Sequence, residues 1–382
     1  LDGEYKMMGL APYGKPEYLP FIRRNLLVTD RPGSYRLNHA LLDYHAALRG
    51  RFSPALRRIF GDPRQGDEAP FTERHQQLAA SAQAAFEEVV FDLASWAFEE
   101  GGRRSHLALA GGCGLNCSAN GRLLREGPFK QIYVPPAPHD AGCAVGATLL
   151  LYHETLGQPR RFTMTHAAYG PAYDDHAIGQ TLRAAGLHMQ PIADEETLLG
   201  KTVEVLTGGG VVGWFQGAME FGPRALGSRS FLADPRRDRI RDTLNAKIKK
   251  RELFRPFAPS VKEEATADYF EVTQPSPFMN LALPVRQDKR AVIPAVTHID
   301  GSARIQTVSR TDQPRYWRLL DRFERATGVP ILLNTSFNIQ EPIVCTPEQA
   351  LATFNTSGVD ALVIGNYFVE RGGGTHKAMY GT

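Results

Sequence analysis

The sequence predicts an α/β fold around a twisted, partly antiparallel sheet. The first observation is a unit of short apolar strand, Gly-rich loop and helix, which occurs twice in succession within residues 106–155. The second is the alternation of short apolar runs with helical patterns after residue 190. Strands and helices that alternate along a chain are typical of an α/β layer.

The first half opens with a long helix over residues 72–101, where apolar side chains recur at three- and four-residue steps. The two strand–loop–helix units follow, as strands 106–110 and 131–134, loops 111–116 and 135–142, and helices 117–126 and 143–155. Because its composition is apolar, the segment 143–152 is interpreted as a core helix.

The second half begins after a boundary rich in Gly, Pro and acids, with a helix ending at Ala185. We expect helices at 195–207, 238–250, 263–270, 313–326 and 346–354, and strands at 211–215, 259–261, 279–283, 304–308, 331–334 and 361–369. The predicted domains are 1–165 and 191–370, with a linker at 166–190 and a tail at 371–382.

Composition excludes several classes of protein. The net charge of +3 does not favour a nucleic-acid-binding surface, and no apolar run approaches the ~20 residues of a membrane helix. Four cysteines without a CxxC pair favour a reducing, cytoplasmic compartment. The chain starts at Leu1 without a signal-peptide pattern, which we interpret as a start inside a longer protein.

The most informative segment is cationic. Between Arg224 and Arg255, eleven Lys or Arg residues face only four acids, and they alternate with Gly, Pro and Phe. A solvated basic face is the ordinary explanation of a charge run. Here Pro and Gly fix the backbone around Arg224 and Arg255, so we expect held cations that bind an anion such as phosphate.

Other elements are weaker by themselves. The loop Gly111–Asn116 precedes a helix, where backbone N–H groups can face an anion, but it is also an ordinary turn. Asp140 is either a first-turn residue of a helix or a metal ligand. Asn334–Asn338 leaves a strand with a hydroxyl and an amide, which suit a phosphate, a carbamoyl group or a plain turn, and Arg304 follows a tight turn.

Together these segments resemble the O-carbamoyltransferases of nodulation-factor and antibiotic biosynthesis. The matching segments are GEYKMMGLAPYG, GGCGLNCSANG, PHDAG, FQGAMEFGPRALGSRSFLADPR, KIKKRELFRPFAPSV, THIDGSARIQTV and LLNTSFNIQEPIV, in the family's order. The resemblance implies part of an actin-like ATPase-fold domain in residues 1–165, then a YrdC-like α/β domain with a twisted mixed sheet. It also implies an ATP-dependent enzyme that makes carbamoyl-adenylate from carbamoyl phosphate and transfers the carbamoyl group to a hydroxyl of a natural product.

The resemblance also assigns residues. Lys249 and Arg251 would be catalytic and form a Lys-x-Arg motif that acts with Ser336 and Asn338. Carbamoyl phosphate and ATP would be bound by Arg224, Lys249, Arg255, Arg304, Ser336 and Asn338, and nucleotide in the actin-like domain by Gly111, Gly112, Asn116 and His139. Asp140 would hold iron (Fe²⁺), and ATP would bring Mg²⁺.

One departure leaves alternatives open. The family's closely spaced metal histidines are not found, since His39 and His45 lie six residues apart without the family's flanks. A carbamoyl- or threonylcarbamoyl-adenylate synthase for tRNA modification, or a non-catalytic nucleotide-binding module, therefore stays as an alternative. The expected partners are carbamoyl phosphate, ATP and a small molecule with an acceptor hydroxyl, and neither nucleic acid nor a membrane is expected. The sequence does not identify the acceptor. A homodimer is one option for the oligomeric state.

Overall fold

The computed structural model describes residues 3–42, 53–66 and 69–371. They form two compact units, Leu1–Leu107 with Arg122–Ile132 and Ala108–Gly121 with Tyr133–Thr382. His45 and all of the predicted tail after Arg371 lie outside the described residues. The domain boundaries predicted from the sequence stay a prediction.

The first unit is organised by one long helix, α4 (Glu73–Glu100), which confirms the helix predicted at 72–101. Packed against α4 are α1 (Glu4–Leu10), the 3₁₀ turn η1 (Ala11–Tyr13) and α2 (Leu19–Asn25). Small side chains such as Ala79 and Ala80 are buried on α4, which lets these neighbours approach closely. The same unit contains strands β1 (Leu27–Val28) and β2 (Arg36–Leu37), helix α3 (Pro54–Phe60) and the segment Arg122–Ile132.

The two predicted strand–loop–helix segments are present. They comprise β3 (His106–Ala108), η2 (Gly112–Leu115) and α5 (Cys117–Glu126), then β4 (Gln131–Tyr133), η3 (Asp140–Gly142), α6 (Cys143–Leu150) and the π-helical turn η4 (Leu151–Thr155). The interpretation of 143–152 as a core helix is wrong, because Leu150 is 62% and Leu151 53% exposed. The apolar composition correctly predicted a helix there, but it did not predict whether other described residues bury that helix.

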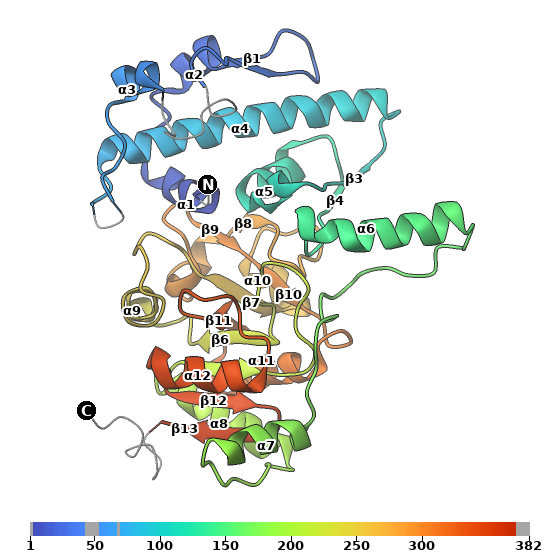
Figure 1. Cartoon of the computed structure of the whole chain (residues 1–382), viewed down its shortest axis with the longest axis vertical. Helices are drawn as coiled ribbons and strands as arrows, with labels where there is room; N and C mark the ends of the chain where they lie inside the picture. The colour runs from blue at the N-terminus through green and yellow to red at the C-terminus, as the bar shows by residue number, and fades with distance from the viewer. Residues whose placement is uncertain (1–2, 43–52, 67–68, 372–382) are drawn as a thin grey trace. The chain divides into compact units, whose positions relative to one another are not determined.

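The second unit is built on a seven-stranded mixed sheet, in the order β10-β7-β11-β6-β5-β12-β13 (Figure 1). The strands are β5 (Val212–Phe215), β6 (Arg229–Ala233), β7 (Ala258–Lys262), β10 (Gln306–Val308), β11 (Ile331–Ser336), β12 (Ala361–Ile364) and β13 (Tyr367–Glu370). The pairs β10–β7 and β5–β12 are parallel, and the other neighbours are antiparallel. The predicted mixed α/β class is therefore confirmed.

Helices pack on this sheet. The longer ones are α7 (Asp175–Ala184), α8 (Glu195–Thr207), α11 (Pro314–Thr327) and α12 (Pro347–Ser357). Helix α8 contacts β5, β12 and α11, while α12 contacts β5, β12 and α7. The remaining elements are α9 (Asp238–Thr243), the π-helical turn η5 (Leu244–Ile248), η6 (Glu263–Ala265), α10 (Thr266–Tyr269), β8 (Ala282–Pro284), η7 (Gln287–Lys289), η8 (Pro294–Val296) and β9 (Ser302–Arg304).

Several strands differ from the sequence prediction, including the run 304–308, which is divided between β9 and β10. No strand was predicted at β6, because the polar residues Arg229 and Ser230 interrupt the apolar pattern expected of a buried strand. The structure buries β6 along its whole length. The run 361–369 is a hairpin of two strands with a turn at Gly365, and residues 279–281 precede β8.

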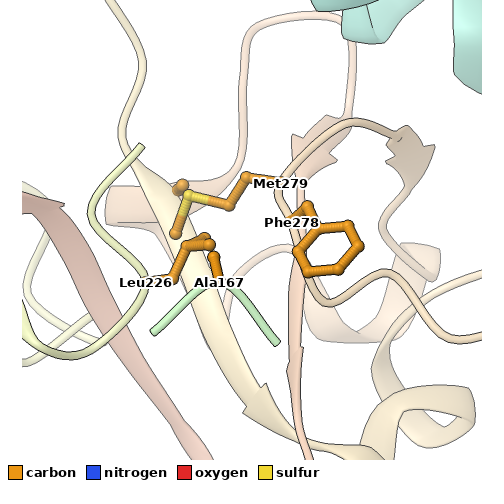
Figure 2. Packing of buried hydrophobic residues seen from close by; sticks show 5 residues of the cluster. Ala167, Leu226, Phe278 and Met279 are labelled. Atoms are coloured by element: carbon orange, nitrogen blue, oxygen red, sulfur yellow. The ribbon is translucent and has the colours of Figure 1, made fainter. Parts of the chain in front are cut away.

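A small apolar cluster anchors the loops around the sheet. Ala167, Leu226, Phe278 and Met279 gather on Ala258 of β7, as Figure 2 shows for the four labelled residues. Leu226 lies two residues after Arg224, so this cluster fixes one end of the segment that carries that arginine. Among the helices of residues 3–42, 53–66 and 69–371, none is long and apolar enough to cross a membrane.

Candidate anion-binding site

Lys249 joins the two motifs that the family resemblance pairs. Its Nζ donates to the backbone oxygen and Oγ of Ser336 at 2.6 and 3.0 Å, and to the backbone oxygen and Oδ1 of Asn338 at 2.8 and 2.7 Å. Lys249 is only 3% exposed, and burial together with the charges of Arg251 and Arg255 puts its pKa well below the ordinary value. These four oxygens solvate the ammonium, so Lys249 holds the end of β11 in place.

The turn around Lys249 is shaped by a buried asparagine that the sequence did not single out. Asn245 Oδ1 accepts a 2.7 Å hydrogen bond from Arg251 Nε, and its Nδ2 donates to the backbone oxygen of Arg255 at 3.1 Å. Lys250, between the two motif residues, has a left-handed φ of 47°. Asn245 therefore fixes the Lys249–Arg255 turn, and it lies in a π-helical turn, a feature frequent at functional sites.

Three arginines meet near this turn. Desolvation and the charges of Arg304 and Arg255 lower the pKa of Arg224, and desolvation and Arg255 lower the pKa of Arg304. Within the described residues, the buried Nε atoms of Arg224 and Arg304 have no hydrogen-bond partner. Buried guanidinium groups whose pKa is lowered by neighbouring cations, and which leave donors unused, form a site suited to an anion.

The Gly-rich loop lies in the same unit as these cations. Cys117, the first residue of α5, is close enough to Arg224 and Arg304 to oppose part of the pKa lowering that desolvation causes in both. A Cβ added at Gly111 or Gly112 would meet no described atom within 4 Å, so the loop has open space beside it. Asn116 is used to cap α5, because its Oδ1 accepts from the backbone N–H of Ala119 at 3.0 Å.

His139 and Asp140 lie beside that loop. Gly111 N donates to the backbone oxygen of Pro138 at 2.7 Å, which ties the two Gly-rich loops together. Nδ1 of His139 is buried without a hydrogen-bond partner among the described residues. Asp140 is exposed and begins η3, which agrees with the first-turn interpretation.

Two buried asparagines fasten these loops to the cationic part of the unit. Asn120 Nδ2 donates to the backbone oxygens of Gly114 and Asn280, at 2.8 and 3.0 Å. Asn280 Nδ2 in turn donates to the backbone oxygen of Pro135 at 2.9 Å. Both residues were missed from the sequence, because an asparagine that bridges distant loops leaves no local spacing pattern.

The described residues do not complete a metal site. No group of three or more His, Cys, Asp or Glu side chains within 3–42, 53–66 and 69–371 is arranged to hold a metal ion. Asp140 therefore has no ligand set in this part of the chain, and iron at Asp140 stays a prediction without a fitting donor group.

The arrangement suits binding of a phosphorylated substrate. Lys249, Arg251, Arg255, Arg224 and Arg304 lie in one unit, although the sequence separates the outermost pair by 80 residues. The charge of Arg255 lowers the pKa of Lys249, of Arg224 and of Arg304. Fixed cations of this kind stabilise charge that develops during phosphoryl or acyl transfer. The fold and the site thus define a mixed α/β unit with a cationic cradle, by which we mean these five residues with Ser336 and Asn338.

Comparison with known proteins assigns the family. Residues 2–149 match the family model for the carbamoyltransferase N-terminus, and residues 203–371 match that for the carbamoyltransferase C-terminus. The chain belongs to the carbamoyltransferase family, which confirms the resemblance drawn from the sequence.

The relatives are longer proteins. An uncharacterized protein of Synechocystis sp. is 45% identical over 97% of this chain and 64% of its own length. Nodulation protein NolNO of Sinorhizobium fredii is 44% identical over 96% of this chain and 53% of itself, and nodulation protein NolO of Bradyrhizobium diazoefficiens is 42% identical over 96% and 66%. The chain thus spans about half to two thirds of the length of these relatives.

Proposed function

We propose that this chain is the part of an ATP-dependent O-carbamoyltransferase that forms carbamoyl-adenylate and passes the carbamoyl group to a hydroxyl of a small molecule. The observation that carries the proposal is the cationic cradle, in which Arg224 and Arg304 have buried donors without partners in the described structure. Family membership indicates that the transferred group is a carbamoyl group. The cradle offers cations that can bind the phosphorylated donor of that group.

The chemistry follows from the charges involved. Hydrolysis of carbamoyl phosphate releases carbamate and phosphate, and a carbamate oxygen then attacks the α-phosphorus of ATP while the bond to pyrophosphate breaks. An acceptor hydroxyl attacks the carbamoyl carbon, and AMP leaves with the electron pair of the broken bond. Each step places negative charge on phosphate oxygens, which arginine forks bind in a bidentate way.

We assign roles within this scheme to the residues that the sequence predicted. Lys249 keeps Ser336 and Asn338 in register with Arg251, and Arg224, Arg255 and Arg304 hold phosphate groups. Gly111, Gly112, Asn116 and His139 would face the nucleotide part of the adenylate. Mg²⁺ would enter with ATP and share its phosphate charge.

The finer fold names are also proposals. An actin-like part before residue 166 and a YrdC-like domain over 191–370 are supported by family membership and by the mixed sheet. The order of the two family models along the chain favours the transferase over a stand-alone adenylate synthase. The antibiotic, sugar or other acceptor stays unassigned.

The test separates the two half-reactions. The protein is incubated with ATP, Mg²⁺ and carbamoyl phosphate, and pyrophosphate and carbamoyl-adenylate are measured by enzyme-coupled assay and mass spectrometry. We expect pyrophosphate release that depends on carbamoyl phosphate and is lost in Arg304→Gln. Release that is independent of carbamoyl phosphate would contradict the proposal, and adenylate without transfer to any hydroxyl acceptor would favour the synthase alternative.

A further inference from the structure

The connection that carries Arg224 is long for its place in the sheet. It runs from Gln216 to Ser228 between the antiparallel neighbours β5 and β6, which ordinarily need only two to five residues. Such a loop is costly to order unless its backbone groups find fixed partners. The cradle therefore depends on whatever holds this loop.

Glu220 supplies those partners from inside the loop. Its backbone forms a β-bridge with Ala168, and its side chain, in a residue only 6% exposed, turns back into the loop. There Oε1 accepts hydrogen bonds from the backbone N–H groups of Leu226, Ser228 and Arg229 at 2.6, 2.7 and 3.3 Å. One carboxylate oxygen thus accepts hydrogen bonds from three of the four backbone N–H groups in the segment 226–229.

The remaining backbone groups of the segment 226–229 also have partners. The one remaining N–H, of Gly227, donates to Ser230 Oγ. The four carbonyl oxygens all accept: Leu226 O from Gln306 Nε2 and Gln313 Nε2, and Gly227 O from Trp214 Nε1. Ser228 O accepts from Gln216 N, and Arg229 O accepts from Phe337 N. Every N–H and C=O in the segment is therefore satisfied. The last bond leads directly to the strand end at Ser336 and Asn338.

Packing leaves the segment a single conformation. Gly227 has φ of 104°, and a Cβ there would lie 2.3 Å from Cδ1 of Tyr316. Leu226 is fixed in the apolar cluster of Figure 2. The position of Arg224, two residues upstream, follows from this segment.

We infer that Glu220 is the positioning residue of the cationic cradle, because its buried carboxylate closes the loop that presents Arg224 beside Arg304. Glu220 itself does not touch the phosphorylated donor. The inference rests on the proposed function only for the identity of the anion that Arg224 binds.

The test compares Glu220→Gln and Glu220→Ala with a matched control. Glu220→Gln keeps one oxygen acceptor but loses its charge, and hydrogen bonds to a charged acceptor are roughly twice as strong as neutral ones. We expect Glu220→Gln to raise KM for carbamoyl phosphate about tenfold with little change in kcat, since losing binding that is equal in the ground state and the transition state raises KM alone. Glu220→Ala should raise KM further, and amide exchange at Leu226, Ser228 and Arg229 should accelerate in the same order.

The control is Asp234→Asn. Asp234 is another buried carboxylate, 1% exposed, at the end of β6, where it pairs with Arg236 at 2.7 Å. We expect this variant to lower the unfolding temperature without changing KM or the exchange of the three amides. A purely structural role for Glu220 would make its variants behave like Asp234→Asn, and that result would overturn the inference.

Failure of the proposed function is distinguishable. If the unmodified protein shows no turnover of carbamoyl phosphate, inorganic phosphate serves as the probe, with its affinity measured by calorimetry for all four proteins. Weaker phosphate binding and faster amide exchange in the Glu220 variants alone would support the inference. Unchanged exchange at the three amides in a folded Glu220→Ala would overturn it.

Discussion

Lys249 shows how one buried cation organises two motifs. An ammonium has three hydrogens, and here it shares them among four oxygens of Ser336 and Asn338. The Lys-x-Arg and Ser-x-Asn motifs could be assigned from the sequence because the family resemblance carries each of them as a short local match. Asn245 and Glu220 could not, since their roles depend on loops that fold back onto them.

Lys249→Met should therefore strongly slow the proposed adenylation step. Methionine fills the volume but cannot donate, so the Ser336 and Asn338 oxygens lose the ammonium; Asn338 Oδ1 then keeps only the hydrogen bond from Ser336 Oγ, and Ser336 O only that from Asn338 N. We therefore expect kcat for carbamoyl-phosphate-dependent pyrophosphate release to fall by about 10²-fold or more. Lys250→Met is the matched control, because Lys250 is the neighbouring, exposed lysine. Equal activity of the two variants would remove Lys249 from the site.

Glu341 gives a prediction about pH. Burial raises the pKa of its carboxyl group, but hydrogen bonds from the backbone N–H groups of Ile339 and Gln340 and from Thr353 outweigh that effect and lower it. A depressed carboxyl pKa contributes stability that is present above the unfolded-state value, about 4.3, and is lost as the pH falls through the folded-state value.

We expect Glu341→Gln to unfold more easily than the unmodified protein at pH 7, by at most about 1 kcal/mol because the carboxylate is exposed to solvent. The difference should shrink toward zero near pH 3. Urea denaturation at both pH values measures it, and a difference that grows on acidification would refute the sign.

At the scale of elements, helices were predicted better than strands. The predicted helices at 117–126 and 195–207 agree with α5 and α8, because periodicity and caps lie within the segment itself. Strand β6 was missed because Arg229 is fully buried, with its guanidinium donating to the backbone oxygens of Gln216 and Pro171. These acceptors come from residues distant in the sequence. From the sequence alone, a charged residue in a central strand is therefore expected to lie on the surface.

Helix α12 offers a test of a local signal. Its N-cap Thr346 forms a capping box, in which Oγ1 accepts from Gln349 N at 3.3 Å and Gln349 Oε1 accepts from Thr346 N at 3.3 Å. Because α12 packs on β5 and β12, we expect Thr346→Ala to lower the free energy of unfolding by about 1 kcal/mol. Thr356→Ala, at the exposed C-terminal end of the same helix, should change it by less than about 0.5 kcal/mol in the same denaturation experiment.

At the scale of the molecule, the Gly-rich loops and the cationic cradle belong to one compact unit. The sequence suggested two separate sites, one on each side of a linker at 166–190. The structure places residues 108–121 and 133–142 in the same unit as Arg224 and Arg304, joined through Asn120 and Asn280. This grouping could not be predicted, because the bonds that create it span 145 to 160 residues.

The grouping predicts that an anionic ligand stabilises this unit as a whole. Under the proposed function carbamoyl phosphate binds the folded cradle and not the unfolded chain, so at 100 times its Kd it should raise the free energy of unfolding by about 2.7 kcal/mol. Trp214, fully buried in β5, reports that unfolding by fluorescence. Raising the ionic strength from about 0.1 to about 1 M should reduce the gain, because the Debye length falls from about 10 to about 3 Å.

The control for this prediction is the double variant Arg224→Gln/Arg304→Gln. Removing two buried charges that repel each other relieves an unfavourable interaction, so we expect the variant without ligand to be at least as stable as the unmodified protein. Carbamoyl phosphate should then give no further stabilisation of the double variant. If carbamoyl phosphate stabilised the double variant as much as the unmodified protein, the anion would bind elsewhere. The cradle would then lose its assigned role.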